Sequence, residues 1–103
     1  MEVFILDRYK PNADIFKAFC DVKRLAIIDL LKSGEQCACV LQSKLGLTQS
    51  GLSYHMKILL QSGIVSARQE GKWTHYKISK DGCETAIKLL KKITDIPNEY
   101  CKK

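Results

Sequence analysis

The stretch LGLTQSGLSYHMKILLQSG, residues 45–63, constrains the fold more than any other part of the sequence. Thr48 is a residue type that often caps the start of a helix, and Gly63 is a residue type that often ends one. Between them, apolar residues recur at helical spacing and predict one buried face, formed by Leu52, Met56 and Leu59. A second row, Gln49, Ser53 and Lys57, is polar and lies on a different side of this helix, so that side is expected to meet solvent or a polar partner.

The segments around this helix predict the remaining elements. We expect helices over residues 11–20, beginning at Pro11 or Asn12, over residues 21–34 with Asp21 as N-cap, and over residues 38–45 ending at Gly46. Two strands then flank the turn Glu70-Gly71-Lys72, and a last helix follows, which Pro97 ends. In the second helix Leu25 is expected to belong to the buried stripe, and in the last helix Ile96 belongs to the apolar side.

This order is helix, helix, helix, helix, strand, strand, helix. Two short helices joined by a three-residue turn and followed by a hairpin are typical of a winged helix-turn-helix, a mainly α fold with a β-hairpin wing. We expect residues 1–103 to form a single domain of this kind. The terminal helices carry more apolar surface than so small a core can use, so we expect them to form the interface of a homodimer.

The distribution of charge indicates a partner. The net charge is +6, and residues 36–80 alone hold six basic side chains against one acidic side chain, Glu70. A basic segment within an otherwise balanced chain is typical of a nucleic-acid-binding protein. A solvated basic surface has the same composition, so the order of the elements decides between the two interpretations.

A helix of this kind fits the major groove of double-stranded DNA, where the residues near its N-terminus reach base edges. Gln49 can pair with adenine, Lys57 would touch the backbone, and the hairpin residues Arg68 and Lys72 would meet the adjacent backbone or minor groove. His55 borders the core, and the sequence leaves two alternative roles for it, a structural hydrogen bond or a contact with a DNA phosphate. The candidate DNA-contacting residues are Thr48, Gln49, Ser50, Gly51, Ser53, Tyr54, His55, Lys57, Arg68 and Lys72.

The segment AFCDVKRLAIIDLLKSGEQCACVLQSKLGLTQSGLSYHMKILLQSGIVSARQEGKWTHYKIS, residues 18–79, resembles the ArsR/SmtB family of bacterial metal- and metalloid-responsive repressors. The resemblance implies a dimeric protein that occupies an inverted-repeat operator and leaves it when an inducer binds. It places the DNA-reading helix at Thr48 to Leu60 and the wing at Arg68 to Tyr76. One departure is DVKR at residues 21–24, where the family usually has Asp-Pro-Thr-Arg.

Two cysteines in EQCACVL are candidate ligands. Residues two apart on a regular helix point about 200° away from each other, so Cys37 and Cys39 can hold one ion only if Cys37 lies outside the helix. The resemblance maps them onto the first two cysteines of the family's Cys-Val-Cys-Asp-Leu-Cys site, and its third cysteine falls on Gln42. Thiolates prefer soft ions, so the expected inducers are As(III), Cd(II) or Zn(II).

The third ligand is left open by the sequence. Cys101, in the basic tail, is the preferred candidate, Cys83 is the next, and Cys20 is expected in the core. Two other interpretations remain: relatives that sense oxidants or reactive sulfur favour a Cys37–Cys101 disulfide, and the cysteines can also be vestigial. Five cysteines and no secretion signal indicate the cytoplasm and free thiols.

Other function classes are excluded or less favoured. No apolar run is long enough to span a membrane. Ser53 and His55 face different ways on a helix, no acid is placed to orient the histidine, and no glycine-rich phosphate loop is present, so we expect no enzyme. A winged helix that binds only another protein is the remaining alternative, and it would lack affinity for DNA.

Overall fold

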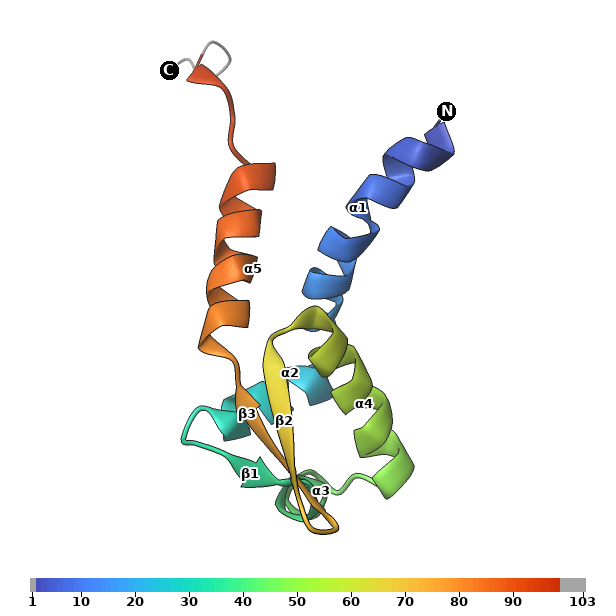
Figure 1. Cartoon of the computed structure of the whole chain (residues 1–103), viewed down its shortest axis with the longest axis vertical. Helices are drawn as coiled ribbons and strands as arrows, with labels where there is room; N and C mark the ends of the chain where they lie inside the picture. The colour runs from blue at the N-terminus through green and yellow to red at the C-terminus, as the bar shows by residue number, and fades with distance from the viewer. Residues whose placement is uncertain (1, 99–103) are drawn as a thin grey trace.

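The computed structural model describes residues 2–98, which form five helices and a three-stranded sheet (Figure 1). The elements are α1 (Glu2–Lys17), α2 (Val22–Leu31), β1 (Gln36–Cys37), α3 (Ala38–Leu45), α4 (Gln49–Ser62), β2 (Val65–Glu70), β3 (Trp73–Ile78) and α5 (Lys80–Ile93). The sheet is antiparallel with strand order β1-β3-β2. This is the winged helix-turn-helix fold that the sequence predicts. In the part of the chain that the structure describes, no helix is long and apolar enough to cross a membrane.

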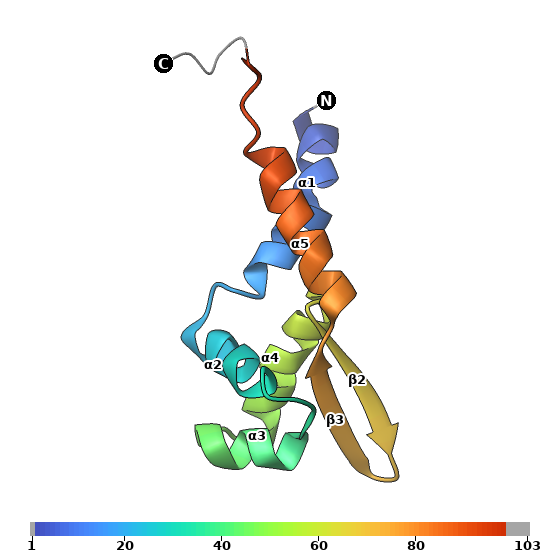
Figure 2. The same cartoon turned by 90° about the vertical axis from the view of Figure 1, so that its left-hand side faces the viewer.

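The molecule is elongated, measuring 54 × 33 × 23 Å along its principal axes. The terminal helices α1 and α5 extend from one end, whereas α3 and the tip of the β2–β3 hairpin lie at the opposite end (Figures 1 and 2). The core lies between α2, α3, α4 and the sheet, and its largest fully buried side chains are Ile27, Leu41, Met56, Leu59 and Ile64. The predicted inner face of α4 is confirmed.

Local signals set the boundaries of α4 as predicted. The hydroxyl Oγ1 of Thr48 accepts a hydrogen bond of 3.0 Å from the N–H of Gly51, and this caps the first turn. Gly63 ends the helix with φ of 81°, a left-handed conformation that favours glycine. The carboxylate of Asp21 caps α2 in the same way, by accepting from the N–H of Lys23.

The N-terminal helix is longer than predicted. It begins at Glu2 and contains Pro11 in its interior, so the expectation that it starts at Pro11 or Asn12 is wrong. Proline has a φ that suits a helix, but inside a helix it removes one hydrogen bond and its ring crowds the carbonyl of the residue four positions before it, so the helix continues through Pro11 at a cost in stability. The helix also ends earlier, at Lys17, which leaves Cys20 exposed in the connection to α2 rather than in the core.

Two apolar residues depart from the sequence prediction, Leu25, which is predicted to be buried, and Ile96, which is predicted to lie on the apolar side of the last helix. The inner side of α2 is formed by Arg24, Ile27 and Leu31, and Leu25 lies off this stripe with 48% of its surface exposed. Ile96 lies beyond the end of α5, which stops at Ile93 before reaching Pro97, and it is 58% exposed. Leu25 is exposed because it lies on the solvent side of α2, and Ile96 is exposed because α5 ends before it.

The strand β1 is absent from the sequence prediction. It has two residues, with Gln36 opposite Tyr76 and Cys37 opposite His75 on β3. Two residues carry no alternation pattern, and the strand exists only because β3 offers a free edge beside it. It attaches the backbone of Cys37 to the wing, which we define as the β2–β3 hairpin, residues 65–78.

Candidate nucleic-acid interface and thiol pair

The solvent face of α4 presents polar side chains near its N-terminus. Exposed along it are Thr48, Gln49, Ser50, Ser53, Tyr54 and Lys57. The short connection from α3 positions this end of the helix, because the left-handed Gly46, with φ of 63°, reverses the chain within three residues. These side chains therefore form one surface that can enter a groove of the size of the DNA major groove.

His55 points the other way and is part of the core, with 7% of its surface exposed. Its Nδ1 lies 2.9 Å from Nη1 of Arg24, which is itself only 5% exposed. Nε and Nη2 of Arg24 also donate to the carbonyl of Lys17, at 3.2 and 3.1 Å. Since a guanidinium only donates, Nδ1 accepts and the imidazole proton resides on Nε2. This contact connects α1, α2 and α4.

Burial lowers the pKa of His55, and the neighbouring Arg24 cation lowers it further, although Asp21 opposes the shift. The neutral imidazole is therefore the form that fits this position. Of the two interpretations that the sequence leaves open for His55, the structural hydrogen bond agrees with these contacts.

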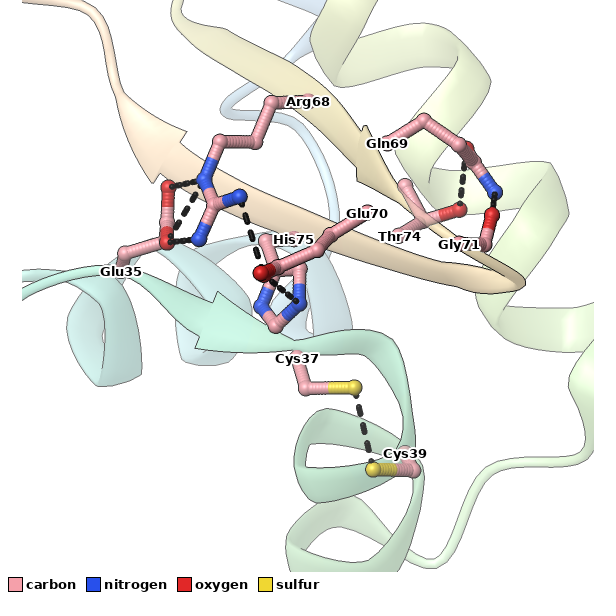
Figure 3. A network of polar contacts seen from close by, with 9 residues as sticks. All are labelled: Glu35, Cys37, Cys39, Arg68, Gln69, Glu70, Gly71, Thr74 and His75. Atoms are coloured by element: carbon pink, nitrogen blue, oxygen red, sulfur yellow. Dashed lines mark hydrogen bonds and ion pairs between the residues drawn. The ribbon is translucent and has the colours of Figure 1, made fainter.

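The guanidinium of Arg68 is held by two carboxylates (Figure 3). Its Nε and Nη2 donate to Glu35 at 2.8–3.1 Å, and its Nη1 donates to Glu70 at 3.1 Å. These bonds raise the pKa of Arg68, and the same contact lowers the pKa of Glu35. Glu70 also lies 3.6 Å from Nε2 of His75. Arg68 therefore joins the segment before β1 to the wing, and its charge is balanced in this structure.

The tip of the wing carries a second cation. Nζ of Lys72 lies 5.6 Å from the centroid of the Trp73 ring, within the range of a cation–π contact. Gly71 supplies the left-handed conformation of the turn with φ of 62°. Lys72 is exposed and belongs to the turn between β2 and β3. The tip of this hairpin lies at the same end of the molecule as α3 (Figure 2), so Lys72 can approach a DNA backbone that α4 approaches.

The two thiols meet at the start of α3. Cys37 occupies the N-cap position with extended backbone, φ −72° and ψ 147°, while Cys39 lies in the first turn. The thiol of Cys39 donates to Sγ of Cys37, and the two sulfur atoms are 3.1 Å apart (Figure 3). The expected geometry, with Cys37 outside the helix, is confirmed.

The environment makes the two thiols unequal. The hydrogen bond from Cys39, together with N–H groups at the start of α3, lowers the pKa of Cys37. The same bond raises the pKa of Cys39, whose proton it uses. Cys37 is therefore the first of the pair to become a thiolate, the form that binds soft ions.

The pair does not make a zinc site by itself. Tetrahedral zinc with Zn–S bonds of about 2.3 Å places two sulfur atoms about 3.8 Å apart and requires four ligands. Among residues 2–98 no group of three or more Cys, His, Asp or Glu side chains is arranged to hold a metal ion. Burial raises the pKa of the half-buried Cys83, which disfavours its thiolate form. Cys101 lies outside the described residues.

Comparison with known proteins assigns the family. The family model described as "Bacterial regulatory protein, arsR family" matches residues 21–67. An arsenical resistance operon repressor of Staphylococcus aureus is 36% identical over 93 residues, which is 90% of this chain and 88% of that protein. This chain belongs to the arsR family of bacterial regulatory proteins.

Two further relatives support the assignment. An uncharacterized HTH-type transcriptional regulator of Methanocaldococcus jannaschii is 42% identical and aligns over 82% of this chain and 97% of its own length. The solution structure of a homodimeric winged helix-turn-helix DNA-binding domain of Mycobacterium bovis superposes with a TM-score of 0.67, covers 91% of this chain and 84% of that one, and is 28% identical. The ArsR-family protein described here is thus a transcriptional regulator, and its family consists of DNA-binding proteins rather than enzymes.

Proposed function

We propose that this ArsR-family protein is a transcriptional repressor that binds an inverted-repeat operator and leaves it when the thiols of Cys37 and Cys39 capture a soft metal ion or metalloid. The observation that carries the proposal is the position of the thiol pair. It sits at the start of α3, the helix that precedes the reading helix α4, and Cys37 is also paired with the wing strand β3. The names of relatives, such as the arsenical resistance operon repressor of Staphylococcus aureus, support this choice of inducer.

In this proposal α4 reads DNA with the exposed side chains near its N-terminus. Gln49, Ser50, Ser53 and Tyr54 face bases and phosphates, Lys57 and Lys72 bind backbone phosphates, and Thr48 and Gly51 form the helix start that attracts a phosphate. His55 contributes through Arg24, by fixing the orientation of α4. Arg68 is half exposed and its charge is balanced by Glu35 and Glu70, so a phosphate would have to compete with these two carboxylates for its guanidinium.

The dimer belongs to the same proposal. Its interface would be formed by the projecting helices α1 and α5, together with Phe19 just after α1, and the large apolar side chains exposed on the two helices are Ile5, Leu6, Tyr9, Ile87, Leu90 and Ile93. The radius of gyration is 16.6 Å, against about 13 Å for a compact domain of this length, as expected for a protomer whose ends pack on a partner. Two α4 helices related by a two-fold axis would read half-sites about one helical turn apart.

Release follows from geometry and linkage. An atom bonded to both sulfur atoms constrains the N-cap of α3, and this constraint passes to α4 through the short turn and to the wing through β1. If the inducer lowers the affinity for DNA, DNA lowers the affinity for the inducer by the same factor. Oxidation is a second candidate trigger, because the thiolate-favouring Cys37 lies beside another thiol.

Salt-dependent binding tests the DNA-reading part of the proposal. Fluorescence anisotropy of a labelled duplex from upstream of the gene should show affinity that falls steeply with salt concentration. Lys57→Gln should weaken binding and lower the slope of log affinity against log salt by about 1, because one phosphate contact is lost. Lys88→Gln, an exposed lysine on α5, is the matched control and should leave both unchanged. Salt-insensitive or absent binding would instead favour a protein-binding role.

A further inference from the structure

A polar cleft opens directly beside the thiol pair, between α3, α4 and the wing. Its volume is about 200 Å³. It is lined by Cys39 and Gln42 from α3, Gln49 and Ser53 from α4, and Trp73 and Tyr76 from the wing. This space is several times the roughly 30 Å³ that one water molecule occupies in the liquid, so it can hold a small organic group.

The two sulfur atoms suit trivalent arsenic better than zinc. Trivalent arsenic carries a lone pair and forms three bonds at angles narrower than tetrahedral, so it brings two sulfur ligands closer together than zinc does. The observed separation of 3.1 Å between Sγ of Cys37 and Sγ of Cys39 is shorter than the sulfur–sulfur distance of about 3.8 Å at tetrahedral zinc, as expected for arsenic. Two thiols leave one of the three bonds of arsenic for another substituent.

The cleft determines where that substituent lies. Gln42 follows Cys39 by three residues on α3, so both side chains share a face of that helix and both line the cleft. The position that a third thiol would need is therefore occupied by an amide, which is a poor ligand for arsenic. Aromatic rings of the wing, Trp73 and Tyr76, border the same space and can pack against an apolar group.

We propose that this cleft is a subsite for the third substituent on an arsenic atom held by Cys37 and Cys39, and that the preferred ligand is a mono-organic trivalent arsenical rather than arsenite. In the capture step the two thiols replace the two hydroxyl groups of R–As(OH)₂. Two S–As bonds form, two As–O bonds break, and each thiol proton leaves with a hydroxide as water. Arsenic stays trivalent, and its organic group enters the cleft. The inference rests on the proposed function, because it takes the thiol pair as the inducer site.

An occupied cleft would act on DNA binding directly. Gln49 and Ser53 belong to the proposed reading surface, and Trp73 adjoins Lys72 at the tip of the wing. An organic group placed between α4 and the wing would either push the two elements apart or fix their relative orientation. The inducer would thus contact both DNA-binding elements.

The test measures arsenical affinity in the reduced, full-length protein without DNA. Calorimetry gives the affinities for phenylarsine oxide, which hydrates to the phenyl form of R–As(OH)₂, and for arsenite. Trp73, the only tryptophan of the chain, reports occupancy of the cleft through its fluorescence. We expect wild-type protein to prefer phenylarsine oxide by about tenfold or more, because a buried phenyl ring adds apolar contact.

Two serine-to-phenylalanine variants distinguish binding of the phenyl ring in the cleft from the general affinity of dithiols for trivalent arsenic. Ser53→Phe fills the cleft and should weaken phenylarsine oxide binding by about tenfold while changing arsenite affinity by less than about twofold. Ser50→Phe places the same ring on the exposed face of α4, away from the cleft, and should leave both arsenical affinities unchanged. Equal affinities of the two variants for phenylarsine oxide would overturn the subsite.

Gln42→Cys tests the vacant third bond of arsenic. It supplies a third thiol beside Cys39 and should raise arsenite affinity by about tenfold or more, which removes the preference for the organic compound. Unchanged arsenite affinity would overturn the inference. If wild-type protein binds neither compound, the thiol-pair role in the proposed function fails as well, whereas loss of the preference alone leaves that role intact. Cys37→Ser should abolish tight binding of both.

Discussion

Gly82→Ala is expected to destabilise the protein by about 3 kcal/mol or more, because no side chain fits at this position. A Cβ atom built on Gly82 would lie 1.7 Å from the carbonyl oxygen of Gly63 and 2.6 Å from its carbon. Both contacts are to backbone, so no side-chain rotation relieves them. The change would force the end of α4 away from the start of α5, and this exceeds the gain of about 1 kcal/mol that alanine brings to a helix.

Urea denaturation of the purified variant measures this loss. Glu84→Ala is the matched control, since Glu84 is exposed on the same helix, and its free energy of unfolding should change by less than about 0.5 kcal/mol. If Gly82→Ala unfolds at the same urea concentration as the wild type, the result would contradict the close packing of Gly82 in α5 against the carbonyl of Gly63.

Arg24→Met is expected to cost about 1 to 3 kcal/mol of stability, because it leaves Nδ1 of His55 without its donor and reduces the Lys17 carbonyl to the one hydrogen bond that it accepts from the N–H of Cys20. Methionine keeps the aliphatic stem of Arg24, but the carbonyl of Lys17 and Nδ1 of His55 both lose hydrogen bonds. Thermal or urea unfolding measures the effect. Lys23→Met, at the exposed neighbouring position, is the control and should change stability by less than about 0.5 kcal/mol.

The same contact gives the unfolding free energy a defined pH dependence. The pKa of His55 is lowered in the folded state, so the unfolded chain takes up a proton first as the pH falls. Stability from this group is present above the ordinary histidine pKa of about 6.5 and is lost as the pH falls from there towards the lower folded pKa. Arg24→Met removes the cation that repels protonated His55, so the loss of unfolding free energy at low pH should be smaller in this variant. A steeper loss in the variant would contradict the assigned Arg24–His55 contact.

The elements that the sequence predicts well are those with local determinants. The cap at Thr48, the stop at Gly63 and the turn at Gly71 each depend on residues within a few positions, and the structure has all three. The inner face of α4 follows from helical spacing alone. The position of Cys37 outside α3 follows from the geometry of a helix start, and it too is confirmed.

The parts that the sequence does not predict join distant residues. Arg24 and His55 are 31 positions apart, and Glu35 and Arg68 are 33 apart, so no local pattern marks either pair. The sequence predicts that Arg68, as a basic residue of the hairpin, meets DNA, and it does not reveal that Glu35 and Glu70 bind the guanidinium. The extension of α1 through Pro11 depends on backbone geometry that composition does not reveal.

The central claim is that chemistry at Cys37 and Cys39 controls the DNA-binding surface, and one measurement tests it most directly. The anisotropy of a labelled upstream duplex bound to reduced protein is followed while phenylarsine oxide or arsenite is added, for wild type, Cys37→Ser and Cys20→Ser. Cys20 is an exposed cysteine away from α3, so its variant is the matched control. The account predicts that wild type and Cys20→Ser release the duplex and Cys37→Ser keeps it. Release by Cys37→Ser at the same arsenical concentration, or no release by any of the three, would contradict it.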